Sequence, residues 1–257
     1  MSRPQWRVTA ASVRGPAHEK AGLPCQDAHH WVAASEAVLI AGVADGAGSA
    51  PLADVGAVLA ARAAAESACR KFSALSSAGQ MEDAAWARLL TETLADAKTA
   101  VEAEANARSL PSSDLASTLI VMVAGPDFVA AAQVGDGAVI AADAGGAMVC
   151  VTRPPAGEYL NETTFLTSAE ALDSVSPVVW RGRLAHLAVI SDGLQMAALK
   201  MPAAEPHPGF FKPLFGFLDT QSDPSAAQEA LTSFLASPRL RARTDDDVTL
   251  ILATLIS

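Results

Sequence analysis

Three apolar runs in this chain each end at an aspartate that is followed by glycine. They are residues 37–44 before Asp45-Gly46, residues 128–134 before Gly135-Asp136-Gly137, and residues 186–191 before Asp192-Gly193. A short apolar run that stops at turn residues is typical of a buried strand, and Asp and Gly favour tight turns. The pattern therefore predicts a fold in which several buried strands present a carboxylate at one end.

The expected elements are segregated along the chain rather than alternating. The patterns predict strands at 6–13, 37–44, 116–124, 128–134, 138–142, 147–151, 163–166, 186–191 and 248–256, helices at 52–72, 82–106 and 223–236, and a loop or short helix with aromatic anchors at 201–217. This order favours an α+β fold in which helices pack on antiparallel sheets. Since no repeat or linker interrupts it, we expect a single domain over residues 1–257.

Composition excludes several classes of protein. The chain has 28 acidic and 18 basic side chains, a net charge of −10 and 51% hydrophobic residues, which argues against general disorder and against nucleic-acid binding. The three cysteines form no CxxC pair, and neither a signal peptide nor an apolar run long enough for a bilayer is apparent. We therefore expect a cytoplasmic protein with reduced thiols and no membrane association.

The aspartates have a common chemical meaning if they meet in space. Asp45, Asp136 and Asp192 follow buried strands, residues 245–247 are three aspartates before the last strand, and Asp27 is expected in a loop. Oxygen ligands at rigid strand ends are what Mg²⁺ and Mn²⁺ prefer, and two such ions activate water and neutralise a phosphate. Each Asp-Gly alone is most simply a turn, so the prediction depends on the set.

The ordered set of motifs resembles the metal-dependent protein phosphatase 2C family, and its compact bacterial members in particular. The resemblance runs from about Val8 to Leu255 and rests on the segments Cys25-Gln26-Asp27, Val43-Ala44-Asp45-Gly46-Ala47-Gly48, Ala116-Ser117-Thr118-Leu119, Val134-Gly135-Asp136-Gly137, Ser191-Asp192-Gly193-Leu194 and Asp246-Asp247-Val248-Thr249. It implies a four-layer αββα sandwich of two antiparallel sheets flanked by helices. It also implies a flap-like excursion at about residues 154–176, beside the active site.

The same resemblance implies roles for individual residues. Asp45 would bridge two Mn²⁺ or Mg²⁺ ions, the Gly46 carbonyl would bind one of them, and Asp192 and Asp246 would bind the other. Asp27 would hold metal-bound waters, and Asp136 would help to bind a third, weaker ion. The implied reaction is hydrolysis of phosphoserine or phosphothreonine by a metal-bridging hydroxide, with Asp45, Asp192, Asp246 and Asp27 as the catalytic set.

The chain departs from the family pattern in two places. The arginine that commonly grips the substrate phosphate is absent, with Gly22 and Leu23 where it is expected, and Arg14 or His18 are candidates to replace it. The histidine that animal members carry after Asp-Gly is Ala47 here. Metal binding is therefore better supported than the grip on the phosphate or protonation of the leaving group.

Three functional hypotheses follow. The first is a bacterial signalling phosphatase, a monomer that acts on phosphorylated proteins and reverses a cognate Ser/Thr kinase. The second is a pseudophosphatase of the same fold that serves as a binding or sensing module. The third is a metal-dependent phosphatase for small phosphate esters.

Overall fold

Two five-stranded antiparallel sheets lie face to face in the computed structural model, which describes residues 4–35, 37–74, 81–154, 163–173 and 175–256. The first sheet has the strand order β1 (Gln5–Val13), β12 (Val248–Ile256), β9 (Leu184–Ile190), β6 (Ala138–Asp143) and β7 (Met148–Thr152). The second sheet has the order β2 (Asp27–Ser35), β3 (Val38–Asp45), β4 (Leu119–Gly125), β5 (Phe128–Val134) and β8 (Val178–Arg181). The prediction of an α+β sandwich with two antiparallel sheets is confirmed.

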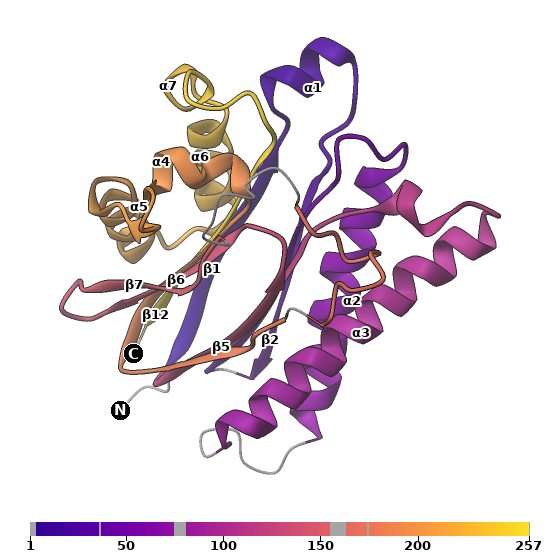
Figure 1. Cartoon of the computed structure of the whole chain (residues 1–257). Coiled ribbons are helices and arrows are strands. Elements are labelled where there is room, and N and C mark those ends of the chain that lie inside the picture. Colours follow the sequence, from indigo (N-terminus) through magenta and orange to yellow (C-terminus); the bar gives the residue numbers. More distant parts are fainter. Residues whose placement is uncertain (1–3, 36, 75–80, 155–162, 174, 257) are drawn as a thin grey trace.

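Helices cover the outer face of each sheet (Figure 1). The second sheet carries α2 (Ala53–Ser73) and α3 (Asp83–Ala107), and the first carries α4 (Gln195–Ala198), α5 (Pro208–Thr220) and α6 (Pro224–Leu235). The shorter elements are α1 (Pro16–Ala21), η2 (Ser112–Leu115), η3 (Asp192–Leu194), α7 (Pro238–Arg241), β10 (Leu199–Lys200) and β11 (Glu205–Pro206). Among the described residues, no helix is long and apolar enough to cross a membrane.

Three apolar layers result from this arrangement. Residues such as Val43, Met122 and Val189 fill the space between the sheets, while Ile40 and Val121 face α2 and α3. Strands β3 and β4 are buried on both faces, which explains their nearly continuous apolar sequences. The four-layer arrangement thus accounts for the runs that first indicated strands.

Helix α2 approaches the second sheet closely because small residues line the contact. Its buried face is mainly alanine, and a Cβ on Gly42 of β3 would lie 2.4 Å from the Ala61 carbonyl oxygen. Such a separation is well inside van der Waals contact, so Gly42 is required for this packing. The helix in turn holds the loop that follows Asp45.

Three expectations about local structure need correction. Asp27 was expected in a loop but is the first residue of β2. The sequence does not indicate this strand because β2 lies at the edge of its sheet, is only partly buried and therefore mixes polar with apolar residues. No strand forms at residues 163–166, and β8 at Val178–Arg181 pairs with β5 instead. The aromatic segment at 201–217 contributes most of α5, which is longer than a short helix and accommodates Pro213.

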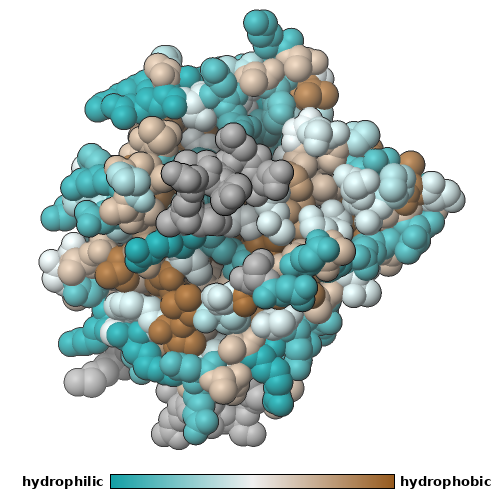
Figure 2. Space-filling view, viewed as in Figure 1, coloured by the Kyte–Doolittle hydropathy of each residue, from teal (hydrophilic) through white to brown (hydrophobic). Residues whose placement is uncertain are grey.

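The space-filling view in Figure 2 shows a hydrophobic area over the edge strands β7 and β8. Val149 and Val178 are exposed on these two strands. Both belong to the sheet edges and not to the pocket described below.

Candidate active site

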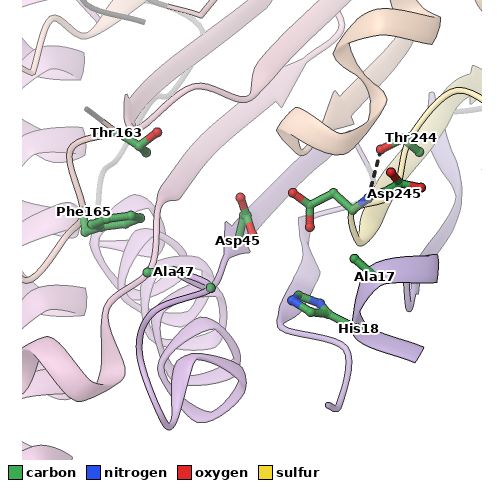
Figure 3. A pocket seen from close by; sticks show the side chains of 11 residues that line it. Ala17, His18, Asp45, Ala47, Thr163, Phe165, Thr244 and Asp245 are labelled. Atoms are coloured by element: carbon green, nitrogen blue, oxygen red, sulfur yellow. Dashed lines mark hydrogen bonds between the residues drawn. The ribbon is translucent and has the colours of Figure 1, made fainter. Parts of the chain in front are cut away.

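A pocket of about 480 Å³ lies at one end of the sandwich, near α1 (Figure 3). Four separate segments form it: α1, the loop after β3, the segment at 163–165 and the turn before β12. The described lining residues are Ala17, His18, Asp45, Gly46, Ala47, Gly48, Thr163, Phe165, Thr244, Asp245 and Asp246. The acidic side chains in this described lining are all aspartates, and it contains neither lysine nor arginine.

Asp45 and Asp27 face each other across neighbouring strands. They are paired in the register of β3 with β2, which places both at the same end of the second sheet. The Asp45 N–H donates to Thr118 Oγ1 at 3.0 Å, and Ser191 Oγ donates to Asp27 Oδ2 at 2.7 Å. The strand pairing therefore brings together two acids that are far apart in the sequence.

Asp192 and Asp246 come from the other sheet. Asp192 begins η3 two positions after the end of β9, Asp246 lies two positions before the start of β12, and these two strands are hydrogen-bonded neighbours. The negative charges of Asp192 and Asp246 both raise the pKa of Asp45. The two sheets thus bring four of the predicted aspartates to a common end of the sandwich.

Burial and mutual repulsion disfavour the charged forms of these acids. Burial raises the pKa of Asp45, and the charges of Asp27, Asp192 and Asp246 raise it further. Burial raises the pKa of Asp27 to about 7, while burial with Asp136 and Asp246 raises that of Asp192 to about 6. A divalent cation among these acids would stabilise their charged forms.

The carboxylate oxygens of these acids are the kind of donor that Mg²⁺ and Mn²⁺ prefer. In the described parts of the chain, no three His, Cys, Asp or Glu side chains already form a metal-binding group. However, Asp27 Oδ1 and Asp192 Oδ1 are buried and have no hydrogen-bond partner among the residues that the structure describes. Buried carboxylate oxygens ordinarily have partners, and a cation or its bound water would supply what these oxygens lack.

Gly46 and Asp136 flank the four acids. A Cβ on Gly46 would lie 2.7 Å from the Ala53 Cβ, so the start of α2 packs directly against this turn. Asp136 lies in the turn between β5 and β6, and burial raises its pKa, with a contribution from Asp246. Thr163, a residue of the pocket lining, acts in the opposite direction and lowers the pKa of Asp136.

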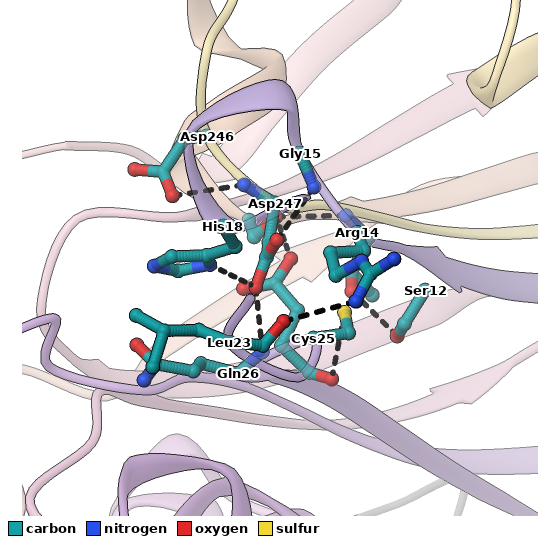
Figure 4. A network of polar contacts seen from close by, with 12 residues as sticks. Ser12, Arg14, Gly15, His18, Leu23, Cys25, Gln26, Asp246 and Asp247 are labelled. Atoms are coloured by element: carbon teal, nitrogen blue, oxygen red, sulfur yellow. Dashed lines mark hydrogen bonds and ion pairs between the residues drawn. The ribbon is translucent and has the colours of Figure 1, made fainter. Parts of the chain in front are cut away.

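Asp247 ties the segment before β2 to the end of the first sheet (Figure 4). Its carboxylate is 1% exposed, and it accepts hydrogen bonds from the Gly15 N–H at 2.6 Å and the Gln26 N–H at 2.5 Å. His18 Nδ1 lies 2.8 Å from Asp247 Oδ2, outside ideal hydrogen-bond alignment. The role of Asp247 escaped sequence analysis, although its place in a run of three aspartates was visible.

The two candidates for the missing phosphate arginine lie in different places. His18 lines the pocket, and its side chain is 14% exposed. Arg14 is exposed and not part of the lining, because its guanidinium donates to the Leu23 carbonyl at 3.1 Å. The structure therefore brings His18, but not Arg14, to the aspartates.

The predicted flap is described only in part, because residues 155–162 and 174 lie outside the described residues. In the segment 163–173, Thr163 and Phe165 line the pocket, whereas Leu166 and Ala171 are fully buried. The Leu166 N–H donates to the Ser117 carbonyl, and Lys98 Nζ donates to the Ser168 carbonyl. These contacts fix the segment against α3 and the second sheet.

The repulsion among the acids predicts a pH-dependent effect of metal on stability. Carboxyls whose native pKa is raised above 3.8 remain protonated in the native state after the unfolded chain has ionised. Their contribution to stability is therefore present below about pH 4 and lost as pH rises to about 7. Mn²⁺ offsets this loss, so we expect it to raise Tm little at about pH 5 and by at least about 5 °C at about pH 8. Thermal unfolding with and without MnCl₂ measures this, and an increment that does not change with pH contradicts it.

Comparison with known proteins places the chain among phosphatases. The family model described as Protein phosphatase 2C matches residues 14–236. The chain is 36% identical over 256 residues to serine/threonine-protein phosphatase 3 of Escherichia coli (strain K12), a match covering 96% of this chain and 98% of the relative.

Solved structures share the fold at lower sequence identity. Serine/threonine phosphatase Stp1 from Staphylococcus aureus has a TM-score of 0.65 and 15% identity, covering 98% of this chain and 96% of that one. The catalytic domain of the phosphatase PstP in complex with two manganese ions has a TM-score of 0.59 and 18% identity, covering 99% and 100%.

Proposed function

Because the chain belongs to the protein phosphatase 2C family, we propose that it hydrolyses phosphoserine and phosphothreonine in proteins with the help of Mn²⁺ or Mg²⁺. The observation that carries this proposal is the meeting of Asp27, Asp45, Asp192 and Asp246, from two sheets, beside a pocket whose described lining contains neither lysine nor arginine. Such a set of mutually repelling acids destabilises the metal-free fold. Groups with strongly perturbed pKa values cluster at functional sites, and binding of cations would offset the repulsion here.

Two cations would be held by the acids nearest the pocket. We assign Asp45 and the Gly46 carbonyl to one ion, and Asp45, Asp192 and Asp246 to the other. When bound, such ions lower the pKa of a water molecule and neutralise the phosphate; we infer that this water bridges them as hydroxide. Asp27 Oδ1, which has no partner within the described ranges, would accept hydrogen bonds from water at the site, and Asp136 would contribute to a third, weaker site.

The pocket walls supply what the carboxylates do not. His18 is the histidine in the described lining of the pocket. We assign its imidazole to contact the phosphate in place of the missing arginine. Phe165 and Ala47 form an apolar side of the pocket, with Ala50, Ala53 and Ala116 behind them. This wall would hold the substrate chain next to the phosphorylated residue and keep bulk water away from it.

The biological setting follows from the proposed reaction. A phosphatase of this kind acts on phosphoproteins and thereby opposes a Ser/Thr kinase. We take the chain to act as one catalytic domain and as a monomer, since the four aspartates and the pocket all come from a single copy.

A direct assay tests the proposed function. Hydrolysis of p-nitrophenyl phosphate, a phosphothreonine peptide and a sugar phosphate is measured with Mn²⁺, with Mg²⁺ and with EDTA. We expect Mn²⁺ to increase turnover of the peptide at least about a hundredfold over EDTA, since the cations supply the activated water. Preference for the sugar phosphate would favour a small-ester phosphatase. Mn²⁺ binding without any turnover would favour a binding module.

A second prediction separates His18 from Arg14. His18→Ala is expected to raise KM for the phosphothreonine peptide about tenfold with little change in kcat, which corresponds to about 1.4 kcal/mol of ground-state binding. Arg14→Ala is the matched control and should leave KM unchanged, because its guanidinium is occupied with Leu23 outside the pocket. Steady-state kinetics at saturating Mn²⁺ measures both. The opposite ranking would return the role to Arg14.

A further inference from the structure

Helix α1 lines the pocket although its own packing cannot hold it there. It projects beyond the strand ends (Figure 1), and none of its six residues, all of which the structure describes, is buried. A helix of this length is not stable in isolation. Even so, Ala17 and His18 of α1 belong to the pocket lining. Contacts with other segments must therefore fix the position of the helix.

The turn before β12 holds the first turn of α1 (Figure 4). The Ala17 N–H donates to the Asp245 carbonyl at 2.9 Å, and the Gly15 N–H donates to the Asp247 carboxylate at 2.6 Å. A Cβ on Gly15 would lie 2.1 Å from the Asp246 carbonyl oxygen, so the two backbones are in direct contact. These contacts act on the start of the helix.

Arg241 provides a second attachment, from α7. Its Nη2 donates to the Arg14 carbonyl at 3.2 Å and to Glu19 Oε1. Since Arg14 precedes α1 and Glu19 lies within it, one guanidinium nitrogen holds the chain on both sides of His18. The neighbouring Leu240 is buried in the apolar layer over the first sheet, which fixes α7 itself.

The arrangement around Arg241 differs from an ordinary surface ion pair. The side chains of Arg241 and Glu19 are 31% and 40% exposed, and an exposed pair by itself contributes little to stability. Here, however, the same nitrogen also bonds a backbone carbonyl, and α1 has no buried residue that would resist displacement. Loss of this attachment would therefore change the position of α1 more than the stability of the whole protein.

We propose that Arg241 is a positioning residue, which holds α1 through Glu19 and the Arg14 carbonyl so that His18 faces the pocket. This inference rests on the proposed function, because it uses the assignment of the His18 imidazole to the substrate phosphate. Arg241 is not part of the described pocket lining, so it acts on the substrate only through the helix. Its loss should weaken substrate binding and leave the cations in place.

Amide hydrogen exchange tests the attachment without any substrate. Uniformly ¹⁵N-labelled full-length protein is studied by NMR with excess Mg²⁺. In Arg241→Met, which removes the donors and keeps an unbranched side chain, we expect the Ala17 N–H to exchange at least about fivefold faster, because its bond to Asp245 opens more often. Arg239→Met is the matched control, since Arg239 is exposed on the same helix, and it should not change the exchange rate. Unchanged exchange in Arg241→Met would overturn the proposal.

A double-mutant cycle tests whether Arg241 acts through His18. Arg241→Met is expected to raise KM for the phosphothreonine peptide about threefold, less than the about tenfold rise expected for His18→Ala, with kcat and the Kd for Mn²⁺ within about twofold of the parent. In the His18→Ala background, the same substitution should raise KM by less than about 1.5-fold, because the side chain that Arg241 positions is already absent. Steady-state kinetics measures the cycle, and electron paramagnetic resonance of free Mn²⁺ measures the Kd.

The outcomes separate this inference from the proposed function. Additive effects of the two substitutions on KM, or a loss of Mn²⁺ affinity that parallels the change in KM, would show that Arg241 does not act through His18 and would overturn the inference. If the Ala17 exchange responds as expected while the parent protein hydrolyses no phosphate ester, the role of Arg241 in holding α1 stands and the phosphatase proposal fails. If Arg241→Met does not fold, Glu19→Ala, an exposed change in the same pair, decides by the same measurements.

Discussion

Asp45→Asn is expected to lower kcat/KM for a phosphothreonine peptide at least about a thousandfold, equivalent to about 4 kcal/mol of transition-state stabilisation. Asparagine has nearly the same shape but only one uncharged oxygen acceptor, so it cannot bridge two cations. Because the charge of Asp45 is repelled by Asp27, Asp192 and Asp246, its removal should also raise the Tm of the metal-free protein. Activity assays with saturating Mn²⁺ and thermal unfolding with EDTA measure the two effects.

Asp143→Asn is the matched control for Asp45→Asn. Asp143 also ends a strand at a turn, and its Oδ1 accepts from the Ala147 N–H at 2.9 Å, an interaction that asparagine can retain. Asp143 does not line the pocket, so its variant should keep parental activity and Tm. Near-parental activity in Asp45→Asn would refute the metal assignment and the mechanism with it.

Asp247→Ala is expected to have the largest effect on stability among the aspartate variants considered. It leaves the buried N–H groups of Gly15 and Gln26 without their acceptor and His18 without its neighbouring charge. Unsatisfied buried donors of this kind cost about 1–3 kcal/mol each. A total of about 3 kcal/mol corresponds to a decrease in Tm of about 6–12 °C for a chain of this length, which differential scanning calorimetry measures.

Asp245→Ala provides the comparison within the same run of aspartates. Its side chain is exposed, and its backbone carbonyl, which accepts from the Ala17 N–H, is retained in the variant. An exposed substitution of this kind changes stability by about 0.5 kcal/mol or less. Equal decreases in Tm for Asp245→Ala and Asp247→Ala would contradict the assigned role of Asp247.

Local patterns were sufficient for most strands and helices. The apolar runs that became β3, β5 and β9 stop at Asp or Gly because water-exposed turns follow, and the alanine-rich segments became α2 and α3 because small residues allow close packing on a sheet. These signals are properties of a few neighbouring residues. These local signals predict the correct elements because both faces of these strands, and one face of each helix, are buried in the folded protein.

Elements at the edge of the sandwich could not be obtained in this way. Strand β2 alternates imperfectly and contains two histidines, and α1 spans only Pro16–Ala21. Each depends on contacts that neither its own composition nor its periodicity encodes. Asp27 was therefore expected in a loop, although its pairing with Asp45 sets the geometry of the second sheet's end.

Periodicity, turn residues and motif order are local properties, and they were enough to predict the fold class, the order of the acids at the strand ends and the resemblance to a family. They could not predict which polar groups meet in the folded chain. Asp247 and Asp27 find their hydrogen-bond partners on other strands and loops, and the pocket contains His18 from α1 but not Arg14. Hydrogen bonds act over about 3 Å, so these contacts arise only after strand register and sheet packing have brought the atoms together.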